Sequence, residues 1–549
     1  MRPLLPSLLT LLLAFAADAS AAPGDLDPTF GTGGIVVADM GSYGVNLPGI
    51  AVQPDGKLVM AGSWGAPSGS PLALLRYLEN GTLDPAFGTA GMVSLSIGQG
   101  TAEAQAVALQ PDGKIVVAGW AIAGGSDAFF VARFLPAGVL DPDFGTAGVT
   151  LVPRGYPNSY SATCLVLQPD GRIVVAGKSK VRDFASTIAL VRYTAGGAVD
   201  LSFFGGAGMV VTDLNEGAGE ARGVALQPDG KIVVAATTGI SHVLLRYTPD
   251  GGLDFVKKVP IASALQPVGL VRMEDGRLVT AGVTAAGFSV YRCLPDGEPD
   301  PTFGVGGLAT IAMPAFSASV KGFAVQSDGR VVVVGSIYDL ATSSDWMSVR
   351  FLADGSSDPT FGINGKLRQV FSSEWDAAER IAIQHDGKLW VIGSSYDGLT
   401  MTRHLGGPLG PYEQWKLAEL GSVNALSAGN GDADAFENLA EYGLRLSPTV
   451  FDTGPVGGRF SYPEGDRLRL IFTREPARND VTIEVLAADD LDGPWTPIAS
   501  SVLGGVTIGA GYYGSDGPGP GPKAVEVRDL YNVDDPAHPR RFLRLRVSR

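Results

Sequence analysis

Short apolar runs separated by turn residues fill most of this chain, and one stretch shows their arrangement clearly. Residues 91–95, 106–110, 114–119 and 129–134 are each rich in β-branched, aromatic or small apolar side chains. Gly, Pro and Asp stand between these runs, where they favour turns. The stretch therefore predicts four short β-strands. The tripeptide Pro-Asp-Gly at residues 111–113 separates the second and third runs and predicts a tight hairpin there.

The same pattern returns seven times between residues 25 and 405. The aspartates of the seven Asp-Gly turns follow one another at intervals of 57, 58, 59, 46, 53 and 58 residues: Asp55, Asp112, Asp170, Asp229, Asp275, Asp328 and Asp386. A period near 50 residues with several strands in each unit is typical of a β-propeller, because only a ring lets each unit bury both faces. We therefore predict an all-β protein with seven four-stranded blades. The second and third strands of each unit are expected to join at these aspartates.

Two motifs recur in the units and carry a family resemblance. Leu-Asp-Pro-x-Phe-Gly first stands at residues 26–31, and the Gln-Pro-Asp-Gly turn with its following strand first stands at residues 53–62. Their pairing resembles the bacterial delta-60 repeat family, over about 380 of the 549 residues. The resemblance implies a secreted or surface-exposed propeller and no defined reaction. The fifth unit departs most, since residues 253–255 lack the proline and glycine and residues 273–276 read Met-Glu-Asp-Gly.

The N-terminal segment, residues 1–21, reads as a signal peptide. Arg2 supplies the positive charge, residues 4–15 form a short apolar core, and Ala19-Ser20-Ala21 is a typical cleavage site. The apolar core is too short for a transmembrane helix. We expect the propeller to occupy residues 22–405 and the protein to be secreted or held at the cell surface.

Beyond residue 405 the repeat stops and the composition changes. Residues 406–450 are expected to form a Gly- and Pro-rich linker with a short helix at residues 412–420. Alternating apolar positions predict a small antiparallel β-sandwich at residues 451–549, with strands near 467–472, 481–486, 524–528 and 542–547. From Trp415 onward the region resembles a C-terminal module of many secreted bacterial proteins. The matching residues are Asn438, Glu441, Tyr442 and residues 541–545, and the resemblance implies an accessory or sorting role.

An acidic loop in the linker offers a candidate calcium site. Oxygen-bearing side chains, with one backbone carbonyl, follow the spacing of an EF-hand loop: Asn430, Asp432, Asp434, Phe436 (carbonyl), Asn438 and Glu441. Asn430 replaces the usual first aspartate, and Ala435 replaces the glycine of the sharp bend. The alternative is a helix start with Asp434 as the N-cap and Glu437 three residues later. Calcium is the one cofactor that the sequence leaves open.

The net charge limits the binding partners that we expect, and the cysteine content limits the disulfides. The formal net charge of −15 argues against nucleic acid and anionic membranes. Cys164 and Cys293 both fall in strand patterns of non-adjacent units, so we expect two buried free thiols rather than a disulfide. We expect a monomer that binds a protein or carbohydrate ligand and has no membrane span.

An arginine and an aspartate keep a constant spacing through the repeats. Arg76, Arg133, Arg192, Arg246, Arg292 and Arg350 are each followed eight residues later by an aspartate: Asp84, Asp141, Asp200, Asp254, Asp300 and Asp358. A structural Arg–Asp clasp at each blade junction is the simplest interpretation, since a guanidinium matches a carboxylate well. An anion-binding ring and independent roles for the two residues are the alternatives. If the clasp exists, the seventh must join Arg403 to Asp27 across the two ends of the ring.

The invariant turns and the variable loops should lie on opposite faces of the ring, because connections alternate between faces in an antiparallel blade. Rigid scaffolds often carry binding residues on variable loops. The aromatic residues of these loops are therefore the candidate ligand-binding residues, or else they plug their own blade edges: Tyr43, Trp64, Trp120, Tyr156, Tyr160, Tyr338, Trp346, Trp375 and Tyr396.

Catalytic motifs are missing from the sequence. The four histidines lie in different units, and there is no Gly-x-Ser-x-Gly elbow or phosphate-binding loop. We therefore expect a non-catalytic, secreted or surface-bound scaffold that binds a ligand. The alternatives are a propeller-type hydrolase or lyase that gathers residues from several blades, and an export cargo whose C-terminal module is a sorting element. Facing carboxylates or a His–Asp pair in the central channel would favour the enzyme. A channel lined by Gly, Ala, Val and Ser would favour the scaffold.

Overall fold

The computed structural model describes residues 22–407, except 41–44, 66–68, 153–158, 181–185, 240, 260–265, 314–316, 340–342, 373, 385 and 397, together with six strands between residues 456 and 548. Every helix or strand within these ranges is a β-strand, which confirms the all-β class. None of the described residues form a helix that is long and apolar enough to cross a membrane. The signal-peptide segment lies outside the described residues.

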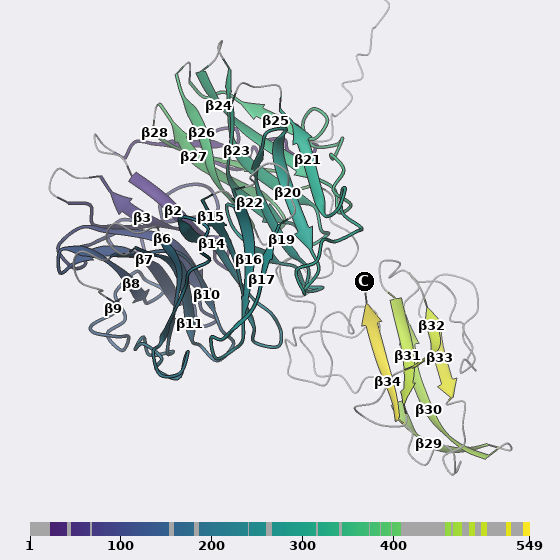
Figure 1. The fold of residues 1–549 in the computed structure, drawn as a ribbon. Helices are drawn as coiled ribbons and strands as arrows, with labels where there is room; N and C mark the ends of the chain where they lie inside the picture. Colours follow the sequence, from purple (N-terminus) through teal and green to yellow (C-terminus); the bar gives the residue numbers. More distant parts are fainter. Residues whose placement is uncertain are drawn as a thin grey trace, which may run out of the picture.

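Seven antiparallel sheets of four strands form the blades, which confirms the predicted count (Figure 1). Blade one contains β2 (Val45–Val52), β3 (Leu58–Trp64), β4 (Leu72–Tyr77) and β5 (Met92–Leu95). Blade two contains β6 (Ala102–Leu109), β7 (Ile115–Ala123), β8 (Ser126–Phe134) and β9 (Val149–Val152). Blade three contains β10 (Ser159–Leu167), β11 (Ile173–Lys180), β12 (Thr187–Tyr193) and β13 (Met209–Thr212).

The next three blades follow the same order of strands. Blade four contains β14 (Gly219–Leu226), β15 (Ile232–Thr238), β16 (Ser241–Tyr247) and β17 (Leu253–Lys258). Blade five contains β18 (Val271–Arg272), β19 (Leu278–Thr284), β20 (Gly287–Cys293) and β21 (Leu308–Ala312). Blade six contains β22 (Ser317–Val325), β23 (Val331–Asp339), β24 (Ser343–Phe351) and β25 (Lys366–Gln369). The shortest repeat unit thus gives a complete blade with a first strand of two residues.

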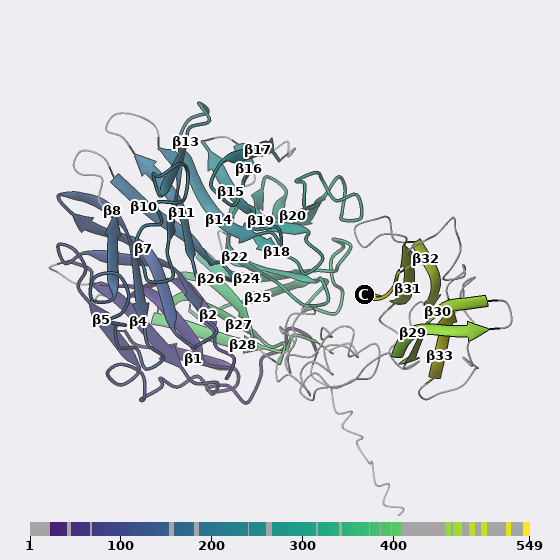
Figure 2. The ribbon, with the colours of Figure 1, turned by 90° about the horizontal axis from the view of Figure 1, so that it is seen from below.

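Blade seven is built from both ends of the propeller and closes the ring. It contains β26 (Asp376–Ile383), β27 (Leu389–Ser395), β28 (Gly398–His404) and the N-terminal strand β1 (Ile35–Ala38). β1 pairs antiparallel with β28, with Ile35 opposite Thr402, and the two strands lie side by side in Figure 2. A strand from the start of the chain therefore completes the sheet that the end of the repeat begins.

The blade boundaries correct the predicted grouping of strands by one position. The run after each Leu-Asp-Pro-x-Phe-Gly motif was expected to open a unit. In the structure this run is the outer strand of the preceding blade, as Met92 pairs with Leu75 of β4. The Asp-Gly turns consequently join the first and second strands of a blade, not the second and third. The hairpins themselves form as expected, and Gly113 of the second turn has a φ of +80°, which glycine accepts without strain.

The hydrophobic core is divided into seven layers, one between each pair of neighbouring blades. The layer between blades one and two, for example, joins Val59 and Leu74 to Ile115 and Phe130, all without exposed surface. The other six layers are built in the same way. Burying one such side chain stabilises a fold by roughly 1.5–3 kcal/mol. Each blade therefore depends on both neighbours, and the ring must be closed to bury the faces of blades one and seven.

The first strand of each blade lies toward the centre of the ring. First strands of neighbouring blades contact one another, as β2 does with β6 and β22 with β26. The Asp-Gly turns and the Leu-Asp-Pro-x-Phe-Gly crossings lie at one end of the strands, which we call the turn face. The connections between second and third strands and those between blades lie at the other end, which we call the loop face. This arrangement confirms the predicted separation of invariant turns from variable loops.

The C-terminal part contains two three-stranded sheets. One is β29 (Val456–Tyr462), β30 (Gly465–Arg474) and β33 (Lys523–Arg528), and the other is β32 (Thr496–Ser501), β31 (Thr482–Ala488) and β34 (Phe542–Ser548). All their strand pairs are antiparallel. The linker, the expected helix at residues 412–420 and the acidic loop lie outside the described residues.

Candidate functional site

The Arg–Asp clasp exists and is most simply seen at Arg76, the penultimate residue of β4. Its Nε donates to Asp84 Oδ2 at 2.9 Å, and its Nη1 donates to the carbonyl oxygen of Pro136 at 2.5 Å. Pro136 belongs to the turn after the third strand of blade two, so the guanidinium joins neighbouring blades. The guanidinium also lies over the ring of Phe87, 4.5 Å from its centroid. The clasp therefore combines an ion pair, a cation–π contact and an inter-blade hydrogen bond.

All seven junctions carry this clasp. The distance from arginine Nε to aspartate Oδ2 is 2.7–2.9 Å in every one, and the guanidinium-to-ring distance is 4.4–5.1 Å. Each arginine also donates to a backbone carbonyl of the following blade: Pro136, Ala195, Pro249, Pro295, Ala353, Gly406 and Glu79. Because the guanidinium groups are occupied in this way, the structure supports the clasp over an anion-binding ring.

A second cation completes each clasp and was missed in the sequence. The residue two positions after each turn aspartate places its side-chain nitrogen 3.1–3.9 Å from the clasp aspartate of the same blade: Lys57, Lys114, Arg172, Lys231, Arg277, Arg330 and Lys388. The lysine or arginine that follows Asp-Gly in every repeat is the sequence pattern that would have predicted this second cation. The turn and the crossing are thus linked electrostatically on the turn face.

The seventh clasp joins the two ends of the ring, as predicted. Arg403 Nε lies 2.9 Å from Asp27 Oδ2, both side chains are almost fully buried, and Lys388 Nζ lies 3.2 Å from the same oxygen. Burial alone would raise the pKa of Asp27. Hydrogen bonds from Thr29 and Lys388 and the charge of Arg403 outweigh burial and lower this pKa to about 2. Asp27 is therefore ionised at neutral pH and binds the arginine as a carboxylate.

His404 adds a second contact at this seam. Its ring lies 2.8 Å from the carbonyl oxygen of Gly24 through Nδ1 and 2.8 Å from the Thr402 hydroxyl through Nε2. Since a carbonyl only accepts, Nδ1 donates to Gly24. Burial lowers the pKa of His404 to about 4, so the ring is neutral at pH 7 and holds the N-terminal segment without charge.

The central strands carry a ring of bulges that the sequence reading also missed. Six first strands shift register at the residue seven positions before the turn aspartate. The residues at this offset differ in every blade: Pro48, Gln105, Thr163, Arg222, Val268, Lys321 and Glu379. Only blade five, with its short β18, lacks the shift among these first strands. Bulges re-aim side chains, and here they place variable chemistry on the strands that line the centre.

Charged groups on these strands are tied to neighbours. Glu103 accepts hydrogen bonds from Asn46 at 2.7 Å and from Gln105 at 2.6 Å, and burial raises the pKa of Glu103. Arg222 pairs with Glu220 at 2.9 Å. Glu103, Arg222 and Glu220 on the first strands are thus engaged with neighbouring polar groups.

Arg380 connects three blades at the centre of the ring. The residue after the bulge is Gly, Ala or Cys in the other blades, but arginine in blade seven. Arg380 donates to the carbonyl oxygens of three bulged residues: Pro48 of blade one at 2.5 Å, Lys321 of blade six at 3.0 Å and Glu379 of its own strand at 2.7 Å. Blade seven is thus fixed on both sides, at its clasp and at its bulge.

Other chemistry-bearing groups of the described residues are buried or dispersed. No group of three or more His, Cys, Asp or Glu side chains that could hold a metal ion occurs within the part that the structure describes. Cys164 and Cys293 are free thiols, as predicted, although Cys164 is only partly buried by exposed area. Burial raises the pKa of both thiols to about 12, so neither is a reactive thiolate. The proposed calcium ligands, residues 430–441, lie outside the described residues.

The nine candidate aromatic residues divide into three groups. Tyr43 and Tyr156 lie outside the described residues. Tyr160 and Trp346 are buried, with 6% and 1% of their surface exposed, while Trp64 at the end of β3 and Trp120 inside β7 are half-buried. The rings of Tyr160, Trp346 and Trp64 pack into core layers between blades. Among the seven candidates that the structure describes, the exposed ones are Tyr338, Trp375 and Tyr396, with 44%, 48% and 66% of their surface exposed.

These three exposed residues lie together on the loop face over blades six and seven, and we call them the aromatic row. Tyr338 of β23 pairs with Ser344 of β24, and Ser344 bridges to Trp375 on its other side. Within blade six, Tyr338 and its partner Ser344 point to the same side of the sheet, and the bridge places the backbone of Trp375 next to Ser344. Asp376 pairs with Ser395, which brings Trp375 and Tyr396 to the same end of blade seven.

The connection that carries Trp375 is held by a buried aspartate. Asp376 has no exposed surface. Its Oδ2 accepts the backbone N–H groups of Phe371 at 2.8 Å and Ser372 at 3.0 Å, and its Oδ1 accepts the Ser372 hydroxyl at 2.9 Å. Phe371 of the same connection stands edge-on to Trp346, with ring centroids 4.8 Å apart. The connection that carries Trp375 is therefore held by hydrogen bonds and by an aromatic contact.

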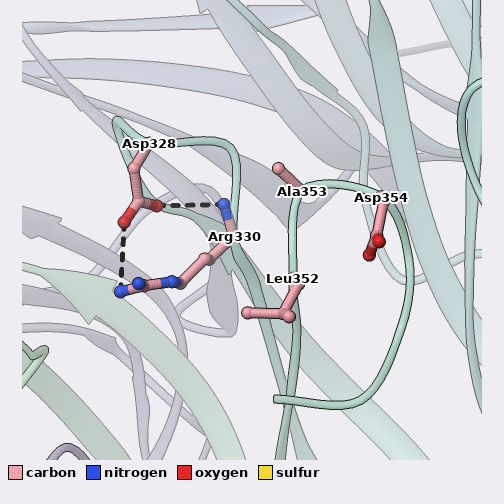
Figure 3. Close-up of a pocket in the computed structure, with 5 residues that line it drawn as sticks. All are labelled: Asp328, Arg330, Leu352, Ala353 and Asp354. Carbon is pink, nitrogen blue, oxygen red and sulfur yellow. Dashed lines mark hydrogen bonds and ion pairs between the residues drawn. The ribbon is translucent and has the colours of Figure 1, made fainter. Parts of the chain in front are cut away.

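A shallow pocket of about 390 Å³ on the turn face is built from clasp elements (Figure 3). Its lining residues are Asp328, Arg330, Leu352, Ala353 and Asp354. Arg330 pairs with Asp328 at 3.2 Å, and the Ala353 carbonyl accepts Arg292 at 2.6 Å. Arg330 and the Ala353 carbonyl already serve the clasps of blades five and six, and Asp354 accepts hydrogen bonds from Ser356, so the loop face is the better candidate site.

Comparison with known proteins gives a family likeness in the repeats. Residues 53–87, 110–144, 168–203, 227–254 and 326–361 match the sequence profile of a family described as "Domain of unknown function (DUF5122) beta-propeller". The first matching segment runs from Gln53 of the first turn to Phe87 of the following crossing, so it spans one clasp with its second cation. The match supports assignment of the chain to a propeller family. No curated protein matches the chain.

Solved structures resemble the chain only distantly. A protein from Lactobacillus plantarum is 10% identical, with 64% of this chain and 96% of that chain covered and a TM-score of 0.36. Prolyl oligopeptidase B from Galerina marginata is 12% identical, with a TM-score of 0.40, and 79% of this chain covers 56% of that chain. At these identities and scores, neither likeness bears on the activity of this protein.

Proposed function

We propose that this protein is an extracytoplasmic, non-catalytic β-propeller that binds a carbohydrate or protein ligand on its loop face. The observation that carries the proposal is the aromatic row, Tyr338, Trp375 and Tyr396. Exposed aromatic residues on a fixed loop lose little entropy on binding and offer both apolar faces and polar edges. The row faces solvent on the variable side of the ring, where scaffold proteins concentrate recognition.

A binding role fits the way the ionisable groups of the ring are used. The clasp aspartates hold arginines, Glu103 holds two amides, and His404 holds the N-terminal segment. Each of these groups is engaged with another part of the ring. We therefore propose binding without a reaction, and monomeric function, since the ring closes within one chain.

The delta-60 resemblance and the N-terminal pattern support an extracytoplasmic location. We propose removal of residues 1–21 on export. We also propose that the two C-terminal sheets pack as a β-sandwich with an accessory or sorting role, and that residues 430–441 bind calcium or, failing that, cap a helix.

A sedimentation experiment tests the proposed function. The full-length mature chain is mixed with the insoluble envelope fraction of the producing organism and centrifuged. We expect the wild-type protein to sediment, and a variant with Tyr338→Ala, Trp375→Ala and Tyr396→Ala to stay in solution. Ile363→Ala on the turn face is the control, because Ile363 is 81% exposed but lies at a crossing. Equal sedimentation of the triple variant would contradict a binding role for the row.

A further inference from the structure

We propose that the aromatic row binds a neutral, extended oligosaccharide. The inference rests on the binding role proposed above and adds the chemical class of the ligand. The apolar C–H face of a sugar ring packs on an aromatic ring, while its hydroxyl groups reach polar groups at the edges. A row of three rings with serine between two of them suits consecutive sugar units of one chain.

The shape of the row favours a chain-like ligand. Tyr338 and Ser344 are paired in blade six, Ser344 forms an isolated bridge to Trp375 at the start of blade seven, and Tyr396 lies in the turn between β27 and β28 of that same blade. Strand pairing holds Tyr338, and the hydrogen bonds that Asp376 accepts hold the connection next to Trp375. Exposed rings spread over two blades match an extended polymer better than a compact small molecule, which would need a concave pocket.

The exposed area of the row argues against a protein partner. A fully exposed aromatic side chain offers about 150–250 Å², so three rings at 44%, 48% and 66% exposure offer roughly 300 Å². A standard protein–protein interface buries about 800 Å² on each partner. Val370 and Val37, 55% and 50% exposed, are further exposed large apolar residues of blades six and seven, and their short side chains add little area. The apolar area therefore fits a few sugar rings and falls short of a stable protein interface.

Charge makes an anionic glycan unfavourable. The chain carries a net charge of −15, and exposed Glu374 directly precedes Trp375. The two cations nearest to Trp375 in sequence are both engaged: Arg380 donates to three backbone carbonyls, and the guanidinium of Arg368 lies against the buried carboxylate of Asp345, Nε at 2.8 Å. Neither of these two cations is left to pair with a polyanion, and a neutral sugar avoids the repulsion.

Binding to printed glycans tests the class of ligand. The full-length mature protein is applied to neutral 1,4-linked gluco-, manno- and xylohexasaccharides, with oligogalacturonate and heparin fragments as anionic comparators. We expect binding to at least one neutral series. Trp375→Ala should weaken this binding at least tenfold, and Tyr338→Ala or Tyr396→Ala several-fold. Trp375→Phe, which keeps an aromatic ring, should retain most of the glycan binding. Ile363→Ala should retain all of the glycan binding.

Treatment of the envelope fraction separates this inference from the proposed function. Periodate, which cleaves vicinal diols of sugars, should abolish row-dependent sedimentation, while protease should leave it unchanged. If protease abolishes sedimentation and periodate does not, the row binds a protein, and the glycan inference is overturned while the binding function stands. Preference for the anionic glycans, or undiminished binding by Trp375→Ala, would also overturn it. Row-independent sedimentation would reject both proposals.

Discussion

The two faces of the propeller ring use the same strands for different purposes. On the turn face, every blade repeats one clasp, and the distance from arginine Nε to aspartate Oδ2 always lies between 2.7 and 2.9 Å. On the loop face, the connections differ in length and composition, and the exposed aromatic rings among the described residues lie over blades six and seven. The turn face stabilises the ring at seven junctions, whereas the proposed binding residues lie over two blades of the loop face.

This difference separates residues that specify the fold from residues that are free to acquire a function. A buried ion pair tolerates no change of either partner, because the remaining charge would be left uncompensated. An exposed aromatic residue on a loop held by other groups can change with little effect on stability. Substitutions on the turn face should therefore lower the stability of the fold, and substitutions in the aromatic row should affect ligand binding with little effect on stability.

Removal of a buried clasp arginine should have the largest effect on stability. Arg350 and Asp358 are almost completely buried, so Arg350→Ala leaves a carboxylate without its cation. We expect a loss of about 3–5 kcal/mol in the free energy of unfolding, measured by urea denaturation of the full chain. Asp143→Ala, at an exposed position of the turn face, is the control and should change stability by less than about 0.5 kcal/mol. Equal effects of the two variants would remove the distinction that defines this face.

The seam clasp should couple the two ends of the ring by a smaller amount. A double-mutant cycle on Asp27→Ala and Arg403→Ala should give a coupling of about 1–3 kcal/mol, the range for hydrogen bonds to charged groups. Hydrogen exchange should show β1 and blade one opening first in either variant. Additive effects of the two substitutions would mean that β1 pairing and the Arg380 contacts close the ring without the clasp.

Acid should weaken the seam through Asp27. Its pKa is about 2 in the folded protein, below the value of about 3.9 expected for an unfolded aspartate. The stabilisation is therefore complete above about pH 4 and is lost as the pH falls toward 2, because the unfolded chain binds the proton more readily there. Between pH 6 and pH 3, wild-type protein should lose more unfolding free energy than Asp27→Ala. A parallel pH dependence would locate the acid sensitivity elsewhere.

The clasp of the degenerate crossing should matter least on the turn face. Asp254 stands in strand β17, which is mostly exposed, and water can solvate its pair with Arg246. Arg246→Ala should therefore destabilise the protein less than Arg350→Ala in the same urea assay. An equal loss would show that the inter-blade hydrogen bond to Pro295, rather than burial, sets the strength of a clasp.

Substitutions in the aromatic row should affect stability least. Trp375→Ala removes an exposed ring while Asp376 keeps its three hydrogen bonds to the loop. The free energy of unfolding should change by less than about 0.5 kcal/mol. Thermal unfolding measured beside the sedimentation assay checks this. A large destabilisation would mean that the ring plugs the blade edge, as Trp346 does, and that lost binding reflects lost structure.

Local chemistry in the sequence was sufficient for the elements and the count of blades. Alternating apolar runs specify strands, and Pro-Asp-Gly specifies hairpins, because both depend on residues close in the chain. Even the seam between Arg403 and Asp27 followed from a constant spacing, since seven equal blades leave one arginine and one aspartate to meet.

Only the tertiary structure decided which strands share a blade and which side chains remain exposed. The run at Met92–Leu95 has the same local pattern whether it pairs with the strand before or after it, so the sequence could not set the blade boundary. Trp346 and Trp375 are both tryptophans near loop-face connections, yet one is buried and the other half exposed. Pairing between sheets, bulges and burial depend on neighbours from other blades, and Arg380, which contacts blades one, six and seven together, has partners that no local pattern contains.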